Sequence, residues 1–177
     1  MDPNKWGKSF WIFLVSAIDT INNKDGEEEL DYEETHKIRR LLEVVGYVLP
    51  CKTTCKPKYF DHLKEIPMTN FTSTKNNAKL WLSYIYNLTL ESQNRFPINY
   101  STFLDKFDRI SNEDKKNHIK ETYINIVNDY PIEPSFDDIM NYKNFFKYTR
   151  DFSLPNSLYI YFIDINPYMS KDRKTHV

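Results

Sequence analysis

The sequence predicts an all-α protein with an extended C-terminal tail, on three observations. Apolar residues recur at three- and four-residue intervals in several long segments, which is the period of one helix face. The 177 residues include only 3 glycines and combine 28% charged with 16% aromatic residues, a composition typical of a helix-permissive globular chain. A chain of this length buries about two thirds of its unfolded surface, so its core needs no covalent staples.

The first predicted helix begins near Asn4, a residue type that caps helix N-termini, and ends at 22–26. Between Trp11 and Val15 apolar side chains point in nearly every direction around the helix axis. We therefore expect this helix to be buried on more than one face.

A second helix is predicted from Tyr32 to Val48, with its apolar side chains on one face. Pro50 then bends the chain, because proline is excluded from a helix interior but suits a first turn. We expect this bend to place Cys51 at the N-terminus of a third helix near 53–64. There the helix dipole and free backbone N–H groups would stabilise a thiolate and lower its pKa.

A fourth helix is predicted over 75–94. The side chains expected to face the interior are Leu80, Trp81, Tyr84, Ile85 and Leu88. Further helices follow over 101–110, over 112–129 and after Ser135, which forms a capping pair with Asp138. The segment 158–163 is rich in β-branched and aromatic residues, which favours one or two strands in the tail.

Charge and hydropathy disfavour several classes of function. The formal net charge is −1, so no overall positive field attracts nucleic acid or anionic lipid, and we expect no nucleic-acid partner. The longest apolar run, 10–17, is far shorter than the about 20 residues of a transmembrane helix. Trp6 and Trp11 are atypical of a signal peptide, so we expect a folded N-terminus and a cytoplasmic location, in a host cytoplasm or virion if the protein is viral.

Cys51 and Cys55 are the only cysteines, too few for a disulfide-scaffolded secreted domain. Their close spacing predicts either a redox pair or half of a metal site. Zinc requires about four ligands, and His62 is the only histidine nearby, so a zinc site would lack a ligand. We therefore predict catalytic cysteines and no metal. The histidines expected to be solvent-exposed, without a role, are His36, His118 and His176.

Three motifs follow one another in the first half of the chain: Trp6-Gly7-Lys8-Ser9-Phe10-Trp11, Leu49-Pro50-Cys51 to Cys55, and Trp81-Leu82-Ser83-Tyr84-Ile85-Tyr86-Asn87. Their order and spacing resemble the Erv/ALR family of FAD-linked sulfhydryl oxidases. That family has a Trp-Gly pair and a second tryptophan, then Pro-Cys-x-x-Cys, then a tryptophan five residues before His-Asn. The resemblance covers about residues 5–96 and is greatest to the branch encoded by large cytoplasmic DNA viruses.

The resemblance implies a four-helix bundle with a short fifth helix over 1–97, FAD at its mouth, and a homodimer. Residues 98–177 would form an extension packed on or beside the bundle. Cys51 would form a mixed disulfide with a dithiol protein substrate, and Cys55 would pass two electrons to the flavin, which oxygen reoxidises to give hydrogen peroxide. The cofactor-binding residues that it implies are Trp6, Gly7, Trp11, Val15, Trp81, Tyr86 and Asn87, with Arg95 as a phosphate partner by charge.

The chain departs from the family pattern in ways that favour a second hypothesis. Three residues separate its cysteines where the family has two, which on a helix leaves the Cα atoms roughly 6 Å apart and within disulfide reach. A bulge at 53–54 could instead absorb the extra residue. Val15 and Tyr86 stand where the family has histidines, and there is no third cysteine for a shuttle pair. The alternative is a redox-inactive relative that serves as a dimeric binding or structural module.

Overall fold

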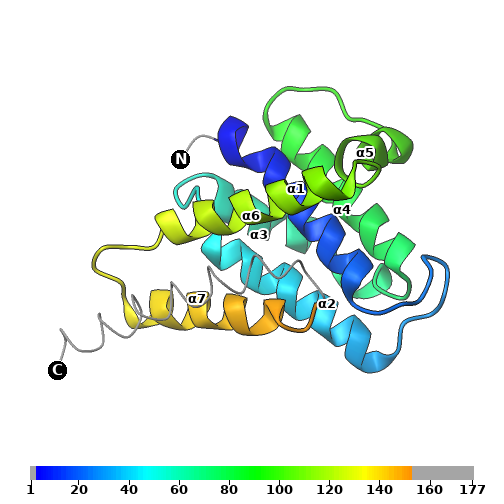
Figure 1. Cartoon of the computed structure of the whole chain (residues 1–177). Coiled ribbons are helices and arrows are strands. Elements are labelled where there is room, and N and C mark those ends of the chain that lie inside the picture. Colours follow the sequence, from blue (N-terminus) through cyan, green and yellow to red (C-terminus); the bar gives the residue numbers. More distant parts are fainter. Residues whose placement is uncertain (1–2, 153–177) are drawn as a thin grey trace.

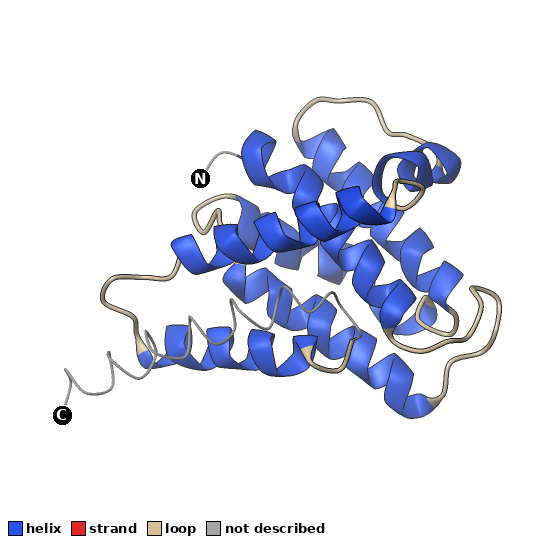
Figure 2. Cartoon of the chain, in the orientation of Figure 1, coloured by secondary structure: helices blue, strands red, loops and turns tan. Residues whose placement is uncertain are grey.

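The computed structural model describes residues 3–152, and this part of the chain is helical without a strand (Figures 1 and 2). The α-helices are α1 (Pro3–Thr20), α2 (Tyr32–Val45), α3 (Cys55–Glu65), α4 (Lys75–Ser92), α5 (Tyr100–Phe107), α6 (Asn112–Asn128) and α7 (Phe136–Thr149). Short 3₁₀ helices follow α2 and α3, namely η1 (Gly46–Val48) and η2 (Met68–Asn70). The all-α prediction is confirmed for the described range, and the predicted strand segment 158–163 lies outside it.

Helix α1 is enclosed by the rest of the described chain. Ile12, Phe13, Leu14 and Val15 are each 0% exposed. Four consecutive residues span a full helical turn, so the middle of α1 is covered on every side. Helix α6 crosses it, and α4 and α5 pack against it as well (Figure 1). The prediction that this helix is buried on more than one face is confirmed.

The helices beyond residue 97 belong to the same hydrophobic core as those before it. Phe103 of α5, Tyr123 of α6 and Phe145 of α7 are all buried within it. The rings of Phe13 and Tyr123 meet edge to face with centroids 5.3 Å apart, which joins α1 to α6. Helix α7 packs along α2 on the other side of the molecule (Figure 1). The domain boundary at residue 97 stays a sequence-based prediction.

Helix boundaries follow local chemistry, with some departures from prediction. The capping pair at α7 is confirmed, because Ser135 Oγ accepts from the Asp138 N–H and the Asp138 carboxylate accepts from the Ser135 N–H, both at 3.0 Å. Helix α2 ends earlier than predicted and continues as the tighter η1. The inward placement of Tyr84 is wrong: its side chain is exposed, since the buried face of α4 runs through Leu82 and Ile85 instead.

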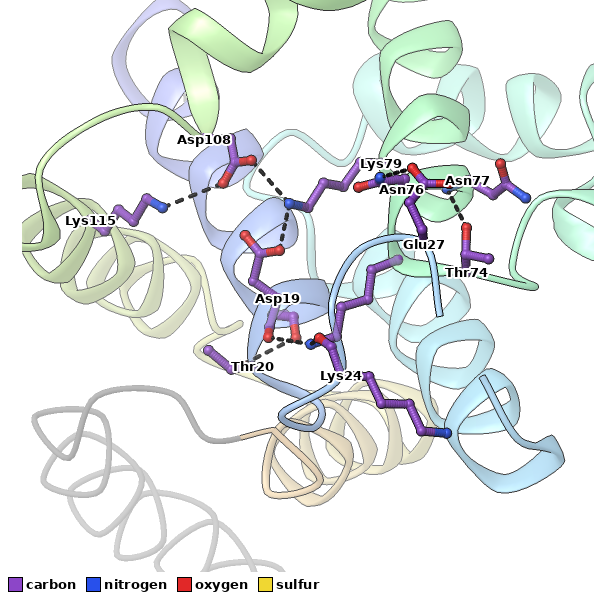
Figure 3. A network of polar contacts seen from close by, with 12 residues as sticks. Asp19, Thr20, Lys24, Glu27, Thr74, Asn76, Asn77, Lys79, Asp108 and Lys115 are labelled. Carbon is purple, nitrogen blue, oxygen red and sulfur yellow. Dashed lines mark hydrogen bonds and ion pairs between the residues drawn. The ribbon is translucent and has the colours of Figure 1, made fainter. Parts of the chain in front are cut away.

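An ion-pair cluster joins α1, α4, α5 and α6 (Figure 3). Lys79 Nζ of α4 lies 2.5 Å from an Asp19 oxygen and 3.0 Å from an Asp108 oxygen. Lys115 of α6 lies 3.4 Å from the other Asp108 oxygen. Burial raises the pKa of Asp19. Burial acts in the same direction on Asp108, but hydrogen bonds with Asp19 and Lys79 hold its pKa below the usual range. The cluster thus fixes the C-terminal end of α1 against its neighbours.

The buried Lys75, at the start of α4, caps the end of α1. Its Nζ donates to the backbone carbonyls of Asp19, Asn22 and Lys24 at 2.8, 2.8 and 2.9 Å. Carbonyls at a helix C-terminus lack partners within the helix, and a cation there also opposes the helix dipole. Burial lowers the pKa of Lys75. One ammonium group therefore satisfies three otherwise unpaired acceptors.

We predict that Lys75→Met destabilises the fold by about 2 to 3 kcal/mol, because it leaves buried acceptors without a charged donor. Urea denaturation at 25 °C measures the loss. The control is Lys116→Met, which changes an exposed lysine of α6 and should alter the free energy of unfolding by less than about 0.5 kcal/mol. Equal effects of the two substitutions would contradict the capping role of Lys75.

Candidate functional site

A cavity of about 540 Å³ lies between the start of α1, α3, the end of α4 and α5. Its size is within the about 300 to 1,000 Å³ of small-molecule and cofactor sites. Trp6, Phe10 and Trp11 of α1 line one side, and Phe107 of α5 lines another. The Trp11 and Tyr86 rings meet edge to face with centroids 5.4 Å apart. The cavity therefore has aromatic walls contributed by α1, α4 and α5.

Six of the residues predicted for the site line this cavity. They are Trp6, Gly7, Trp11, Cys55, Tyr86 and Arg95. They come from α1, α3, α4 and the loop after α4, so the fold brings together segments that are up to about 90 positions apart in the sequence. A Cβ added at Gly7 would meet no atom within 4 Å, so glycine there leaves open space beside the aromatic wall.

Three other predicted cofactor residues are not among those that line the cavity. Val15 is fully buried in the core. Trp81 is also fully buried, and its indole N–H donates to the Ile66 carbonyl at 2.8 Å. The Asn87 side chain donates to the Ile98 carbonyl and accepts from the Ile98 N–H, both at 2.9 Å. Asn87 therefore holds the loop that carries Arg95.

Cys51 and Cys55 form a disulfide with Cα atoms 5.2 Å apart. The prediction that Cys51 lies at the N-terminus of the third helix is wrong. Residues 52–54 form a turn, α3 begins at Cys55, and Cys51 is only 8% exposed. Cys51 Sγ accepts from the Cys55 N–H at 3.3 Å and lies 3.0 Å from Thr54 Oγ1. The turn thus directs the Thr54 hydroxyl and the Cys55 N–H at Cys51, while Cys55 lines the cavity.

The charged groups around the cavity are mostly basic. Lys8, Lys58, Arg95 and Lys106 line it with exposed side chains, and Asp105 is the acidic residue among the lining set. Exposed cations beside an apolar cavity attract an anionic group such as a phosphate. The site therefore combines an aromatic interior with a positively charged rim.

Two buried nitrogen atoms of the cavity have no hydrogen-bond partner within the described range 3–152. They are Trp6 Nε1 and His62 Nε2. Leaving a buried polar group unpaired costs about 1 to 3 kcal/mol, so both atoms favour an occupant that carries hydrogen-bonding groups. Burial lowers the pKa of His62, which keeps its imidazole neutral near pH 7. The sequence reasoning weighed His62 only as a metal ligand, although it is two helical turns from Cys55.

Other candidate sites are weaker. His118 was expected to be exposed, but it is half-buried and its Nδ1 lies 2.8 Å from Ser9 Oγ, which ties α6 to α1. Among residues 3–152 no group of three or more His, Cys, Asp or Glu side chains could hold a metal ion. Within the same range no helix is long and apolar enough to cross a bilayer.

Comparison with known proteins assigns no family. No protein-family model, curated protein or solved structure matches this chain. The resemblance to the Erv/ALR oxidases therefore depends on the sequence motifs alone, and the function has to be argued from the cavity and its residues.

We predict that the neutral state of His62 makes stability depend on pH. Its pKa in the folded protein lies below its unfolded value of 6.5, so the unfolded chain binds more protons as pH falls below 6.5. The stability that depends on a neutral His62 is complete above pH 6.5 and is lost as pH falls through the pKa of His62 in the folded protein. Between pH 7.5 and 5.5 the urea midpoint should fall less in His62→Gln than in the parent protein. His36→Gln is the control and should retain the parent dependence; a parent-like fall in His62→Gln would contradict the assignment.

We predict that Thr54 stabilises the Cys51 thiolate after reduction, because its hydroxyl reaches that sulfur through the local turn. Thr54→Val should raise the pH midpoint for alkylation of Cys51 by about half to one pH unit. Rapid iodoacetamide labelling followed by peptide mass spectrometry gives the midpoint for each cysteine. The matched control is Thr53→Val, an exposed neighbour, and equal midpoints for both variants would contradict the role.

Proposed function

We propose that the protein is an FAD-dependent thiol oxidase of the Erv/ALR type, which makes disulfides in a dithiol protein substrate and passes the electrons to oxygen. One observation carries this proposal. Cys55, half of the only cysteine pair, lines the same cavity as Trp6, Trp11 and Tyr86. A redox-active sulfur beside an aromatic-walled cavity is the arrangement that dithiol-to-flavin electron transfer requires.

The residues of the cavity are compatible with FAD. Trp11 and Tyr86 supply apolar surface for a flat ring system, and Arg95 with the neighbouring lysines supplies charge for the pyrophosphate. The unpaired Trp6 Nε1 would gain a hydrogen-bond acceptor. Gly7 keeps space open at the wall. When bound, the flavin supplies acceptance of two electrons and their transfer to oxygen, with hydrogen peroxide as the product.

The thiol half of the reaction needs only the cysteine pair and a dithiol. A substrate thiolate attacks one sulfur of the Cys51–Cys55 disulfide, and the other sulfur leaves as a thiolate. The second substrate thiolate then displaces the enzyme sulfur from the mixed disulfide. The substrate has lost two electrons and two protons, and both cysteines are reduced. With Cys51 as the attacked sulfur, Cys55 leaves first and Cys51 leaves in the second displacement, where Thr54 and the Cys55 N–H stabilise its thiolate.

The finer features of the resemblance belong to the same proposal. They are the four-helix bundle with a short fifth helix within residues 1–97, the homodimer, and a cytoplasmic or virion location. The packing of α1 and α3 on α4 supports the bundle assignment for these three helices, whereas α2 packs chiefly along α7.

The second candidate is a redox-inactive binding or structural module. The observation that favours it is the burial of Cys51, which is 8% exposed and which a protein dithiol would have to reach. The replacement of the two family histidines by Val15 and Tyr86 favours it as well. The two candidates differ in whether the purified protein retains flavin and consumes oxygen.

The test is oxygen uptake by the purified, FAD-supplemented protein with dithiothreitol as the dithiol. We expect a flavin absorption band in the bound protein, and loss of more than about 90% of the uptake in Cys51→Ser and in Cys55→Ser, because neither variant can form the disulfide. Flavin retained in both variants is the control for folding. Uptake that survives either substitution would contradict the catalytic assignment, and a protein that binds no flavin would favour the redox-inactive module.

A further inference from the structure

His62 lies on the cavity face of α3 together with Cys55. Residues seven apart on a helix are almost two full turns apart and therefore project from the same side. Both residues line the cavity, and Tyr59 between them lines it as well. Cys55 presents the sulfur at the start of α3, and His62 presents an imidazole deeper along the same face.

The hydrogen bonding of His62 is incomplete. Its Nε2 is buried, has no partner among the described residues, and belongs to a side chain that lines the cavity. Trp6, which is 6% exposed, presents a second unpaired buried nitrogen from the opposite element, α1. Two unpaired nitrogens from different helices in one cavity indicate a polar occupant, because without one both buried atoms would lose free energy of hydrogen bonding.

The surroundings of His62 keep its imidazole neutral. Burial is the main influence and lowers its pKa. The carboxylates of Asp61 and Glu65 on α3 and Glu91 on α4 act in the opposite direction, and Lys58 acts with burial. A neutral imidazole can donate from one ring nitrogen and accept at the other, so His62 can serve either kind of ligand atom.

We propose that His62 is a cofactor-binding residue, which hydrogen-bonds FAD through Nε2 and supplies from α3 the imidazole that Val15 and Tyr86 do not supply from α1 and α4. This inference rests on the proposed function, because it takes FAD as the occupant. It adds a contact that none of the sequence motifs contains. The role is binding, and it does not require His62 to transfer a proton to the cysteines.

The experiment measures FAD affinity by titration of flavin fluorescence. The variants are His62→Leu, His62→Gln and the control His36→Leu, which changes an exposed histidine that stacks on Tyr32. We expect His62→Leu to weaken binding about tenfold, the equivalent of one hydrogen bond. His62→Gln, which keeps a donor and an acceptor, should recover most of the affinity, and His36→Leu should bind as the parent does. The visible spectrum of bound flavin should shift in His62→Leu and not in His36→Leu.

The outcomes separate the inference from the proposed function. Parent protein that binds FAD, with unchanged affinity and spectrum in His62→Leu, would overturn the role of His62 and leave the oxidase proposal standing. If the parent protein binds no FAD, both the role of His62 and the oxidase proposal are overturned, and this measurement requires no variant.

A measurement without substitution keeps the inference testable if His62→Leu does not fold. Diethyl pyrocarbonate modifies accessible neutral imidazoles, and peptide mass spectrometry identifies the modified histidine. Bound FAD should protect His62 and leave His36 reactive. Equal modification of His62 with and without FAD would overturn the contact.

Discussion

The structure depends on the enclosure of α1, a helix whose middle is apolar on every side. Residues 12–15 point in all directions around the helix axis, so they are buried only if several helices pack around them. Helices α4, α5 and α6 do so. The polar contacts at the end of the helix follow from this burial. Carbonyls at a helix end lack partners within the helix, so Lys75 donates to those at this end, while the partly buried Asp19 pairs with Lys79. The apolar core thus determines where charged groups have to be placed.

The cavity lies where this enclosure is incomplete. At the N-terminal turns of α1 the large side chains Trp6 and Trp11 meet α3, the end of α4 and α5 without filling the space between them. Large aromatic side chains in a site of this kind leave flat walls and a few polar edges. The same packing that buries the middle of α1 therefore positions its aromatic start beside Cys55. This is why a core element and the candidate site share one helix.

Periodicity and caps were sufficient to predict the helices, because each depends on residues close together in sequence. The face of each helix that is buried was predicted less well. Trp81 and Tyr86 are five positions apart, which rotates them by about 140° around the helix axis, and of the two only Tyr86 lines the cavity. Trp81 instead faces the core and the Ile66 carbonyl. The lining by Phe107 and Ile110 was not predictable, since it depends on how the chain after residue 97 packs back on α1.

The two sulfurs of the cysteine pair differ in their surroundings, and this difference constrains any mechanism. Under the proposed function, an occupant of the cavity would lie against Cys55, and a protein thiol would approach Cys51 from the other side. There Lys52 is 3.9 Å from Asp129 and 5.5 Å from the centre of the Tyr142 ring. The turn beside Cys51 thereby contacts the end of α6 and the middle of α7, helices that lie beyond the three motifs. Contacts of a partly exposed lysine with a carboxylate and a ring are weak, about 1 kcal/mol each at most. The turn between the two cysteines is therefore linked to α6 and α7, while the cavity is built chiefly from the segments that carry the motifs.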